Sequence, residues 1–292
     1  RAVITHAHAD PARAGHGHVL ATAISDGVLR SRLGQGLNLQ GLAYGEVVVH
    51  NGVRISLHPA GHVLGSAQVR VEHRGQVWVA SGDYLCTAHD EVNPTCAAFE
   101  PVPCDVFITE ATFGLPVFRH PDDAGEIRSL LASVEQFPDR CHIVGAYALG
   151  KAQRVLAGVD AGIGPLFVHP AVEPLNAAYR AVGVPLAPTR VLGPGKVDAA
   201  TRAALKQALV VAPPMVRGSA CSTSPRTEAN STSCTRTAGS QSAMICPSSD
   251  APRRQFRGTK TWPARWQARH TVICSIELRP RKAMRCDAGR PL

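Results

Sequence analysis

The architecture follows from Ala2-Val3-Ile4-Thr5-His6-Ala7-His8-Ala9-Asp10, a short apolar run that passes directly into two histidines and an aspartate. We expect Val3-Ile4-Thr5 to form a strand and the residues after it to form a loop at the end of that strand. Two imidazoles at i and i+2, with a carboxylate at i+4, can converge there on one metal ion. Neutral imidazole is a good zinc ligand, and a carboxylate adds a hard oxygen. The alternative is a pair of incidental histidines in a surface turn.

Two later segments carry the same kind of signal. His62 lies in a glycine-flanked turn that follows a predicted strand, and Asp83 lies in Ser81-Gly82-Asp83-Tyr84, again just after a strand. Taken alone, each is as easily a loop residue as a metal ligand. In this order, three strand ends deliver side chains to one edge of a sheet. The sequence therefore predicts a metal site whose ligands are His6, His8, Asp10, His62 and Asp83.

The pattern of apolar residues divides the first 190 residues into two parts. Residues 1–112 predict a helix at about 17–32 and strands at 3–5, 46–49, 53–57, 67–71, 77–80 and 105–109, the last of these buried on both faces. Gly52 and Gly75 mark turns between strands. The next part predicts strands at 142–146 and 166–169 that alternate with helices at 122–137, 151–159 and 172–182. Such alternation favours a parallel sheet.

Length and composition exclude several classes of protein. The 292 residues suffice for one large or two modest domains. No apolar run is long enough to span a membrane, and no signal segment opens the chain. The nine cysteines include no CxxC pair, which argues against a zinc finger, and their odd number favours a reducing compartment. We therefore expect a cytoplasmic protein without a membrane partner. Because the chain opens on Arg1 inside a predicted strand, we also expect that its true start is missing.

The last quarter of the chain differs from the rest. Residues 1–216 hold 17 Lys and Arg against 18 Asp and Glu, whereas residues 217–292 hold 14 against 4. Five of the nine cysteines also lie in this tail. Ser, Thr and Arg recur there without the period of a helix or strand, so we expect neither. A disordered basic tail could bind nucleic acid. Translation in a wrong reading frame explains the five cysteines, Trp262 and Trp266 better than a disordered tail does.

The order of these motifs resembles the metallo-β-lactamase superfamily. Ile108–Gly114 is similar to the acidic motif that opens the β-CASP nuclease branch, and Gly145–Gln153 is similar to that branch's small-residue loop and basic helix start. The resemblance covers about residues 1–190. It is strongest to ligase-associated DNA exonucleases in three strings, His58–Gln68, Pro101–Arg119 and Gly145–Arg154.

This resemblance implies an α/β fold with three segments. Residues 1–117 would form an incomplete αββα sandwich of the metallo-β-lactamase type, without its first strands. Residues 118–216 would form a β-CASP-like α/β domain. Residues 217–292 would be a basic tail of low order, out of frame in the interpretation that we favour.

The resemblance also implies a zinc-dependent phosphodiesterase. In the family two zinc ions polarise a phosphodiester, and a water between them attacks phosphorus. His6, His8 and His62 would hold the first zinc. Asp10 and Asp83 would belong to the second, with Asp83 bridging, which makes both carboxylates catalytic. Mn²⁺ is the alternative ion.

Three further residues receive roles through the resemblance. Glu110 would orient a metal ligand or the substrate. His169 would act as the acid near the leaving group and so be catalytic. Lys151, at a predicted helix start, would bind a substrate phosphate. A solvated surface lysine is the alternative for Lys151.

The chain departs from the family at the second metal. The family motif is HxHxDH, but its sixth position here is Pro11, which cannot bind a metal. A late family histidine is also missing, since the tail contains only His270. After Asp83, where the family is basic, Leu85–Val92 is acidic. We therefore expect one zinc site, a doubtful second site and impaired activity.

Four functions are compatible with these residues. The first is a nuclease that hydrolyses DNA from 3′ ends in DNA repair, partnered with an ATP-dependent DNA ligase and a helicase. The second is an RNA-processing nuclease of the same branch. A small-molecule hydrolase is the third, but the segment 122–190 argues against it because it matches a domain that covers nucleic acid. The fourth is a non-catalytic metal-binding remnant.

Overall fold

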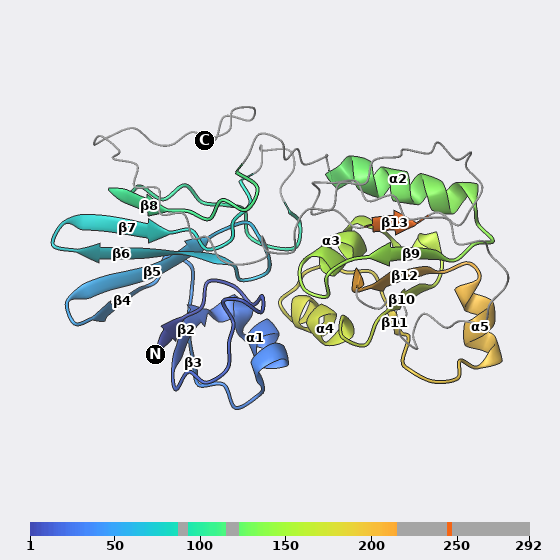
Figure 1. Ribbon diagram of the computed structural model, residues 1–292, viewed down its shortest axis with the longest axis horizontal. Coiled ribbons are helices and arrows are strands. Elements are labelled where there is room, and N and C mark those ends of the chain that lie inside the picture. The colour runs from blue at the N-terminus through green and yellow to red at the C-terminus, as the bar shows by residue number, and fades with distance from the viewer. Residues whose placement is uncertain (87–92, 115–122, 215–243, 247–292) are drawn as a thin grey trace, which may run out of the picture.

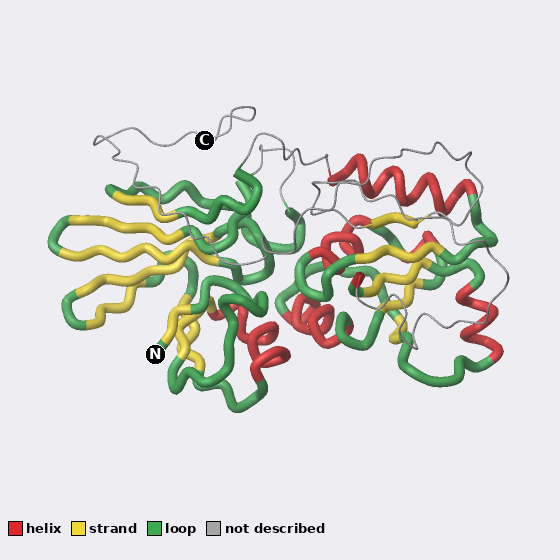
Figure 2. The backbone as a smooth tube through the Cα atoms, viewed as in Figure 1, coloured by secondary structure: helices red, strands yellow, loops and turns green. Residues whose placement is uncertain are grey.

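The protein consists of two regions that lie side by side (Figure 1). This computed structural model describes residues 1–86, 93–114, 123–214 and 244–246. Residues 1–114 form the N-terminal region, and residues 123–214 with 244–246 form the C-terminal region. The acidic residues 87–92 and all of the tail except 244–246 lie outside the described residues. Figure 2 shows that strands dominate the N-terminal region, whereas the C-terminal region alternates strands with helices.

The N-terminal region begins with a small parallel sheet in the order β1-β2-β3. Its strands are β1 (Ala2–Val3), β2 (Val19–Thr22) and β3 (Leu39–Leu42), and a short 3-10 turn (Ala23–Ser25) leads into α1 (Asp26–Leu33). The helix predicted at 17–32 is therefore wrong over its first part. Val19 and Ala21 are buried, and β2 pairs with a strand on each side. Pairing in the sheet overrides the local sequence signal there.

A five-stranded sheet follows, in the order β4-β5-β6-β7-β8. Asn51-Gly52 and Arg74-Gly75 have positive φ at both residues, which is the two-residue turn that suits the twist of a hairpin. These turns confirm Gly52 and Gly75 as breaks between strands. Neighbouring strands are antiparallel except for the parallel pair β7–β8. The strands are β4 (Val47–His50), β5 (Val53–Pro59), β6 (Ala67–His73), β7 (Gln76–Ala80) and β8 (Val106–Ile108).

Two expectations for this part need correction. The strand that includes Val106–Ile108 was expected to be buried on both faces, yet all three residues are partly exposed because β8 is an edge strand. The three strand ends were expected at the edge of one sheet. They belong to two sheets, since β1 lies in the small sheet, whereas β5 and β7 lie in the larger one. The backbone N–H of Ala67 donates to the carbonyl of Thr5 at 2.8 Å and joins the two sheets there.

The C-terminal region is a sheet covered by helices on both faces. Its strand order is β11-β10-β12-β9-β13, and all neighbours except β13 are parallel, as predicted. One face packs against α2 and α3 through Leu130, Val155 and Leu156, and the other packs against α5 through Leu205. The strands are β9 (His142–Gly145), β10 (Leu166–Val168), β11 (Arg190–Val191), β12 (Leu209–Ala212) and β13 (Met244–Cys246). The helices are α2 (Asp123–Gln136), α3 (Lys151–Gly158), α4 (Glu173–Ala181) and α5 (Ala199–Leu205), with a 3-10 turn at Ala161–Ile163.

One strand contradicts the expectation of a tail without regular structure. Met244–Cys246 forms β13 and pairs antiparallel with β9. Three residues are too few to show an alternating pattern, so only the pairing with β9 identifies this strand. Among the described residues, no helix has the length and apolar character needed to cross a membrane.

The two regions share one apolar core. Ile4, Val28 and Leu29 from the N-terminal region pack in the same buried cluster as Leu175 and Tyr179 from α4. The backbone N–H of Leu64 also donates to the Tyr179 hydroxyl at 3.1 Å. This shared core holds the loops after β1 and β5 against the C-terminal region.

Candidate metal centre

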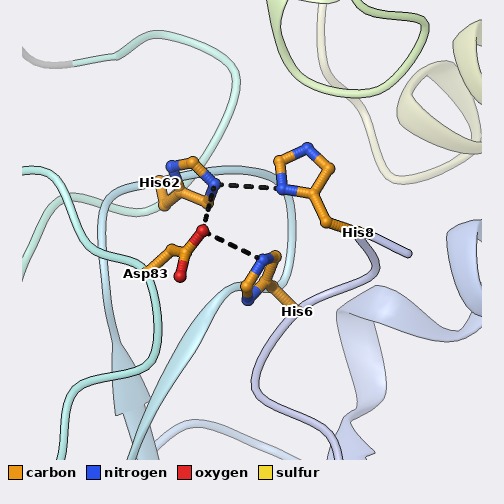
Figure 3. A group of neighbouring side chains, drawn as sticks. All are labelled: His6, His8, His62 and Asp83. Carbon is orange, nitrogen blue, oxygen red and sulfur yellow. Dashed lines mark hydrogen bonds and ion pairs between the residues drawn. The ribbon is translucent and has the colours of Figure 1, made fainter. Parts of the chain in front are cut away.

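Three loops bring four predicted ligands together. His6 and His8 follow β1, His62 lies between β5 and β6, and Asp83 follows β7. One nitrogen of each imidazole and one carboxylate oxygen lie within 4.8 Å of one another. Figure 3 shows the four side chains pointing toward a common point. We call this group the metal-ligand cluster.

The separations inside the cluster are close to contact. Asp83 Oδ2 lies 3.5 Å from His6 Nε2 and 3.7 Å from His62 Nε2. His62 Nε2 lies 3.2 Å from His8 Nδ1. The three ring centroids are 4.9–5.1 Å apart, and the rings meet edge-on at 71–89°. The donor atoms, rather than the ring angles, show that the four groups are close enough to share one ion.

Hydrogen bonds outside the cluster determine which nitrogen His6 and His8 present to it. His6 Nδ1 is 3.1 Å from the Thr5 hydroxyl, which leaves Nε2 directed at Asp83. His8 Nε2 is 3.3 Å from the carbonyl of Leu149, which can only accept, so this nitrogen carries the proton. Nδ1 of neutral His8 is then unprotonated and faces the cluster. The guanidinium of Arg32 donates to the Ala7 carbonyl and secures the loop between the two histidines.

The surroundings keep the imidazoles neutral. Burial, with the nearby His8 and Arg32, lowers the pKa of His6 to about 3. Burial and the other two histidines likewise lower the pKa of His62 to about 3. Burial, with the negative charges of Glu110 and Asp10, raises the pKa of Asp83 to about 6. Neutral imidazole is the form that binds metals, and a cation would offset the repulsion at Asp83.

The donor set fits a metal ion. His6 Nε2 is buried and has no hydrogen-bond partner among the described residues, and such atoms are rare unless something else satisfies them. Three imidazole nitrogens and one carboxylate oxygen form a complete tetrahedral set for a divalent metal. The side chains of the metal-ligand cluster can therefore hold one such ion.

Asp10 and Glu110 lie near the cluster but are not among its four groups. Asp10 is exposed; burial lowers the pKa of His8 and the charge of Asp10 partly opposes this, whereas the same charge adds to the effect of burial that raises the pKa of Asp83. Glu110 follows β8, and its carboxylate accepts from the backbone N–H of Thr112 at 2.7 Å. Both carboxylates therefore act on the cluster through their charge.

His169 is the residue predicted to act as the acid near the leaving group. His169 follows β10, and its Nδ1 accepts from the backbone N–H of Ala171 at 3.1 Å. It is not among the four clustered groups.

No family model matches the chain. Over 225 residues it is 28% identical to a Probable DNA ligase of Opitutus terrae, covering 75% of this chain and 21% of the relative.

Other relatives are named as RNA-cleaving proteins. The chain is 31% identical over 125 residues to cleavage and polyadenylation specificity factor subunit 3 of Dictyostelium discoideum, with 42% of this chain and 16% of the relative covered. It is 28% identical over 125 residues to Endoribonuclease YSH1 of Candida glabrata, with the same shares covered.

The chain is related to the β-CASP nucleases of the metallo-β-lactamase superfamily. The family predicted from the motifs is thus confirmed, although the matched part spans about a fifth or less of each relative named here. One solved structure, a protein of unknown function from Enterococcus faecalis, has a similar fold. Its TM-score is 0.51 at 13% identity, and 72% of this chain and 57% of that one are covered.

In this relative of the β-CASP nucleases, the metal-ligand cluster opens into a cleft between the two regions. His8, His62 and Asp83 line one wall, and Tyr147, Lys151 and Arg154 are among the residues of the other. The Lys151 ammonium lies 4.8 Å from the centre of the Tyr147 ring. Burial lowers the pKa of Lys151. Lys151 is the first residue of α3, as predicted, and it lines the same cleft as the cluster.

Sequence reasoning missed several residues of this cleft. Arg154 lies one helical turn after Lys151 in α3, so the i, i+3 spacing could have placed both on one face. Tyr147 is 59% exposed beside the cluster, and nothing in its local pattern distinguishes it from a core aromatic residue. The Leu149 carbonyl that binds His8 is a backbone group and carries no sequence signal.

Proposed function

We propose that this protein is a metal-dependent nuclease that hydrolyses DNA phosphodiester bonds, acting from 3′ ends in DNA repair. The observation that carries the proposal is the metal-ligand cluster, in which four donor atoms lie within 4.8 Å beside a cleft. His6, His8, His62 and Asp83 would hold Zn²⁺, with Mn²⁺ as the alternative ion. The fold would be an incomplete αββα sandwich with a β-CASP-like domain.

The residues around the ion have separate roles in this proposal. A bound zinc ion supplies a water of lowered pKa and polarises a phosphoryl oxygen. Lys151 would hold a substrate phosphate in the cleft, where burial strengthens its attraction to an anion. Glu110 would orient a metal ligand or the substrate, since its backbone N–H donates to the hydroxyl of Ser81, two residues before Asp83, at 3.4 Å. His169 would protonate the leaving group, which requires the substrate to extend beyond the cleft.

A second ion would depend on Asp10 and Asp83. Pro11 stands where the family has a further histidine, so this second site would be weak and activity low. Pro11→His is the direct test. A gain of a second zinc per chain, or of hydrolysis, would show that Pro11 is what weakens the second metal site. If neither appears, Pro11 is not the only change in the chain that impairs the site.

DNA is favoured over RNA by how much of the chain each similarity covers. The match to the protein named as a DNA ligase extends over 75% of the chain, against 42% for the two proteins named for polyadenylation or RNA cleavage. An ATP-dependent DNA ligase and a helicase are the proposed partners, in the cytoplasm. The second candidate is an RNA-processing nuclease, favoured by the names of the other relatives. The third is a non-catalytic metal-binding remnant.

One experiment separates these candidates. The full chain is purified, its zinc content is measured by mass spectrometry, and labelled DNA and RNA of one sequence are incubated with it in parallel. We expect about one zinc per chain and slow loss of nucleotides from DNA 3′ ends, both abolished in His8→Ala. Faster cleavage of RNA would support the second candidate. Zinc without hydrolysis of either would support the third.

A further inference from the structure

One of the four clustered side chains is oriented by the opposite region. His8 belongs to the loop after β1, but its Nε2–H donates to the carbonyl of Leu149, which precedes α3 in the C-terminal region. This bond is what leaves Nδ1 of His8 facing His62 Nε2 at 3.2 Å. The ring of His62 can donate to His8 or accept from it, whereas the Leu149 carbonyl can only accept, so among these two contacts the carbonyl is the one that selects which nitrogen of His8 carries the proton.

The loop that carries Leu149 is held by a single buried side chain. Gln153 is fully buried, and its Oε1 accepts from the backbone N–H of Gly150 at 2.7 Å. Its Nε2 donates to the carbonyl of Ala148 at 3.0 Å. One amide group is therefore hydrogen-bonded to the residues on both sides of Leu149. Gly150 adopts φ 86°, a conformation that only glycine adopts without strain.

The Gln153 amide is itself held from α4. Its Nε2 also donates to Asn176 Oδ1 at 2.8 Å, and Asn176 Nδ2 donates to Glu173 Oε2 at 3.2 Å. Asn176 is fully buried as well. Glu173 accepts in addition from Arg180 at 2.7 Å. Buried amides whose polar atoms are all hydrogen-bonded have one defined orientation, so Gln153 holds the Leu149 loop rigidly.

We propose that Gln153 is a positioning residue that sets the tautomer of His8 across the boundary between the two regions. The chain of contacts runs from Asn176 to Gln153, from Gln153 to the Leu149 carbonyl, and from there to His8. In the metal-free protein this keeps the proton on Nε2. Its effect on zinc rests on the proposed function, because a metal ligand whose outer partner is lost binds about 10–100-fold more weakly.

The tautomer is measured directly, without metal or substrate. The full chain is labelled with ¹⁵N-histidine and treated with chelator, and the ring nitrogens of His8 are assigned by comparison with His8→Gln. We expect the wild type to show a protonated Nε2 and Gln153→Ala to show a mixture of both tautomers. An unchanged Nε2–H tautomer in Gln153→Ala would overturn the proposal.

Two further variants keep the test independent of stability. Thr189→Val removes the hydrogen bond from the Thr189 hydroxyl to Glu173, at the far end of the same network, and should leave the His8 tautomer unchanged. If it shifts the tautomer as much as Gln153→Ala does, general loosening is the cause and the proposal fails. Gln153→Glu keeps an acceptor for the Gly150 N–H. It should restore part of the wild-type tautomer and serves if the alanine variant does not fold.

Zinc affinity provides the second measurement. By competition with a chelating dye, Gln153→Ala should bind Zn²⁺ about 10–100-fold more weakly than the wild type. Thr189→Val should bind it as the wild type does. A wild type that binds no zinc would refute the proposed function, yet the tautomer would still be readable. Equal affinities in the wild type and Gln153→Ala would refute the positioning role alone.

Discussion

The two regions contribute to the cleft in different ways. In the N-terminal region, the four groups that can bind a metal stand on three loops that follow strands. In the C-terminal region, a helix start supplies Lys151, and a buried network of amides holds the Leu149 loop. The N-terminal region therefore supplies the groups that can bind a metal, and the C-terminal region supplies charge and orientation. Residues of both regions line the cleft.

The largest expected effect tests the supply of ligands. His62→Ala should weaken Zn²⁺ binding by more than about 100-fold, beyond what loss of an outer partner costs, because a direct ligand is removed. The measurement is competition with a chelating dye. His58→Ala is the matched control, since His58 lies on β5 close to the cluster but pairs with Glu100 at 3.1 Å. Equal losses in both variants would count against the cluster as the metal site.

The next effect tests whether the two regions fold as one unit. Leu29 is fully buried in the core that both regions share, so Leu29→Ala should lower the free energy of unfolding by about 2–5 kcal/mol. Because the core is shared, we expect a single transition in calorimetry. Leu57→Ala, in a cluster confined to the N-terminal region, is the control. Two separated transitions in the Leu29 variant would show that the regions unfold independently.

A smaller effect sharpens the role of the Leu149 loop. Gly150→Ala should lower the free energy of unfolding by about 1–3 kcal/mol, because φ is 86° and the added Cβ would lie 2.6 Å from Val63 Cγ1. Gly15→Ala has a similar φ of 98° but meets nothing within 4 Å, so it isolates the backbone strain. Denaturant unfolding measures both. If Gly15→Ala costs as much as Gly150→Ala, the contact with Val63 contributes nothing.

The smallest effect is a pH dependence in the C-terminal network. Burial opposes ionisation of Glu173, but hydrogen bonds from Thr189, Arg180 and Asn176 outweigh it and lower its pKa below the usual 4.5. A lowered pKa means that the ionised carboxylate stabilises the fold above pH 4.5 and that this stabilisation disappears as the pH falls. The stability gap between wild type and Glu173→Gln, measured by urea unfolding, should therefore shrink on acidification. A gap that is constant from pH 7 to pH 3 would contradict this.

In both regions some elements could be predicted from the sequence and others could not. The strands around His62 and Asp83 alternate or carry glycine turns, so their positions were confirmed within two residues, and so were α2, α3 and α4. Strands β3, β11 and β12 and helix α5 were not predicted. Such short elements, like the part of β2 that was expected as helix, are stabilised by pairing and packing with distant segments rather than by local preference.

The sequence by itself pointed to five candidate ligands, which include the four clustered side chains, and to their places after strands, because a metal site needs particular side chains and these occur in a readable order. It also determined the parallel sheet, through alternation of apolar periods. Only the tertiary structure decided that the four clustered side chains come from two sheets, that Asp10 and His169 are not among them, and that a backbone carbonyl 141 residues away orients His8. Backbone groups are the same in every residue, so contacts made by them appear only once the chain has folded.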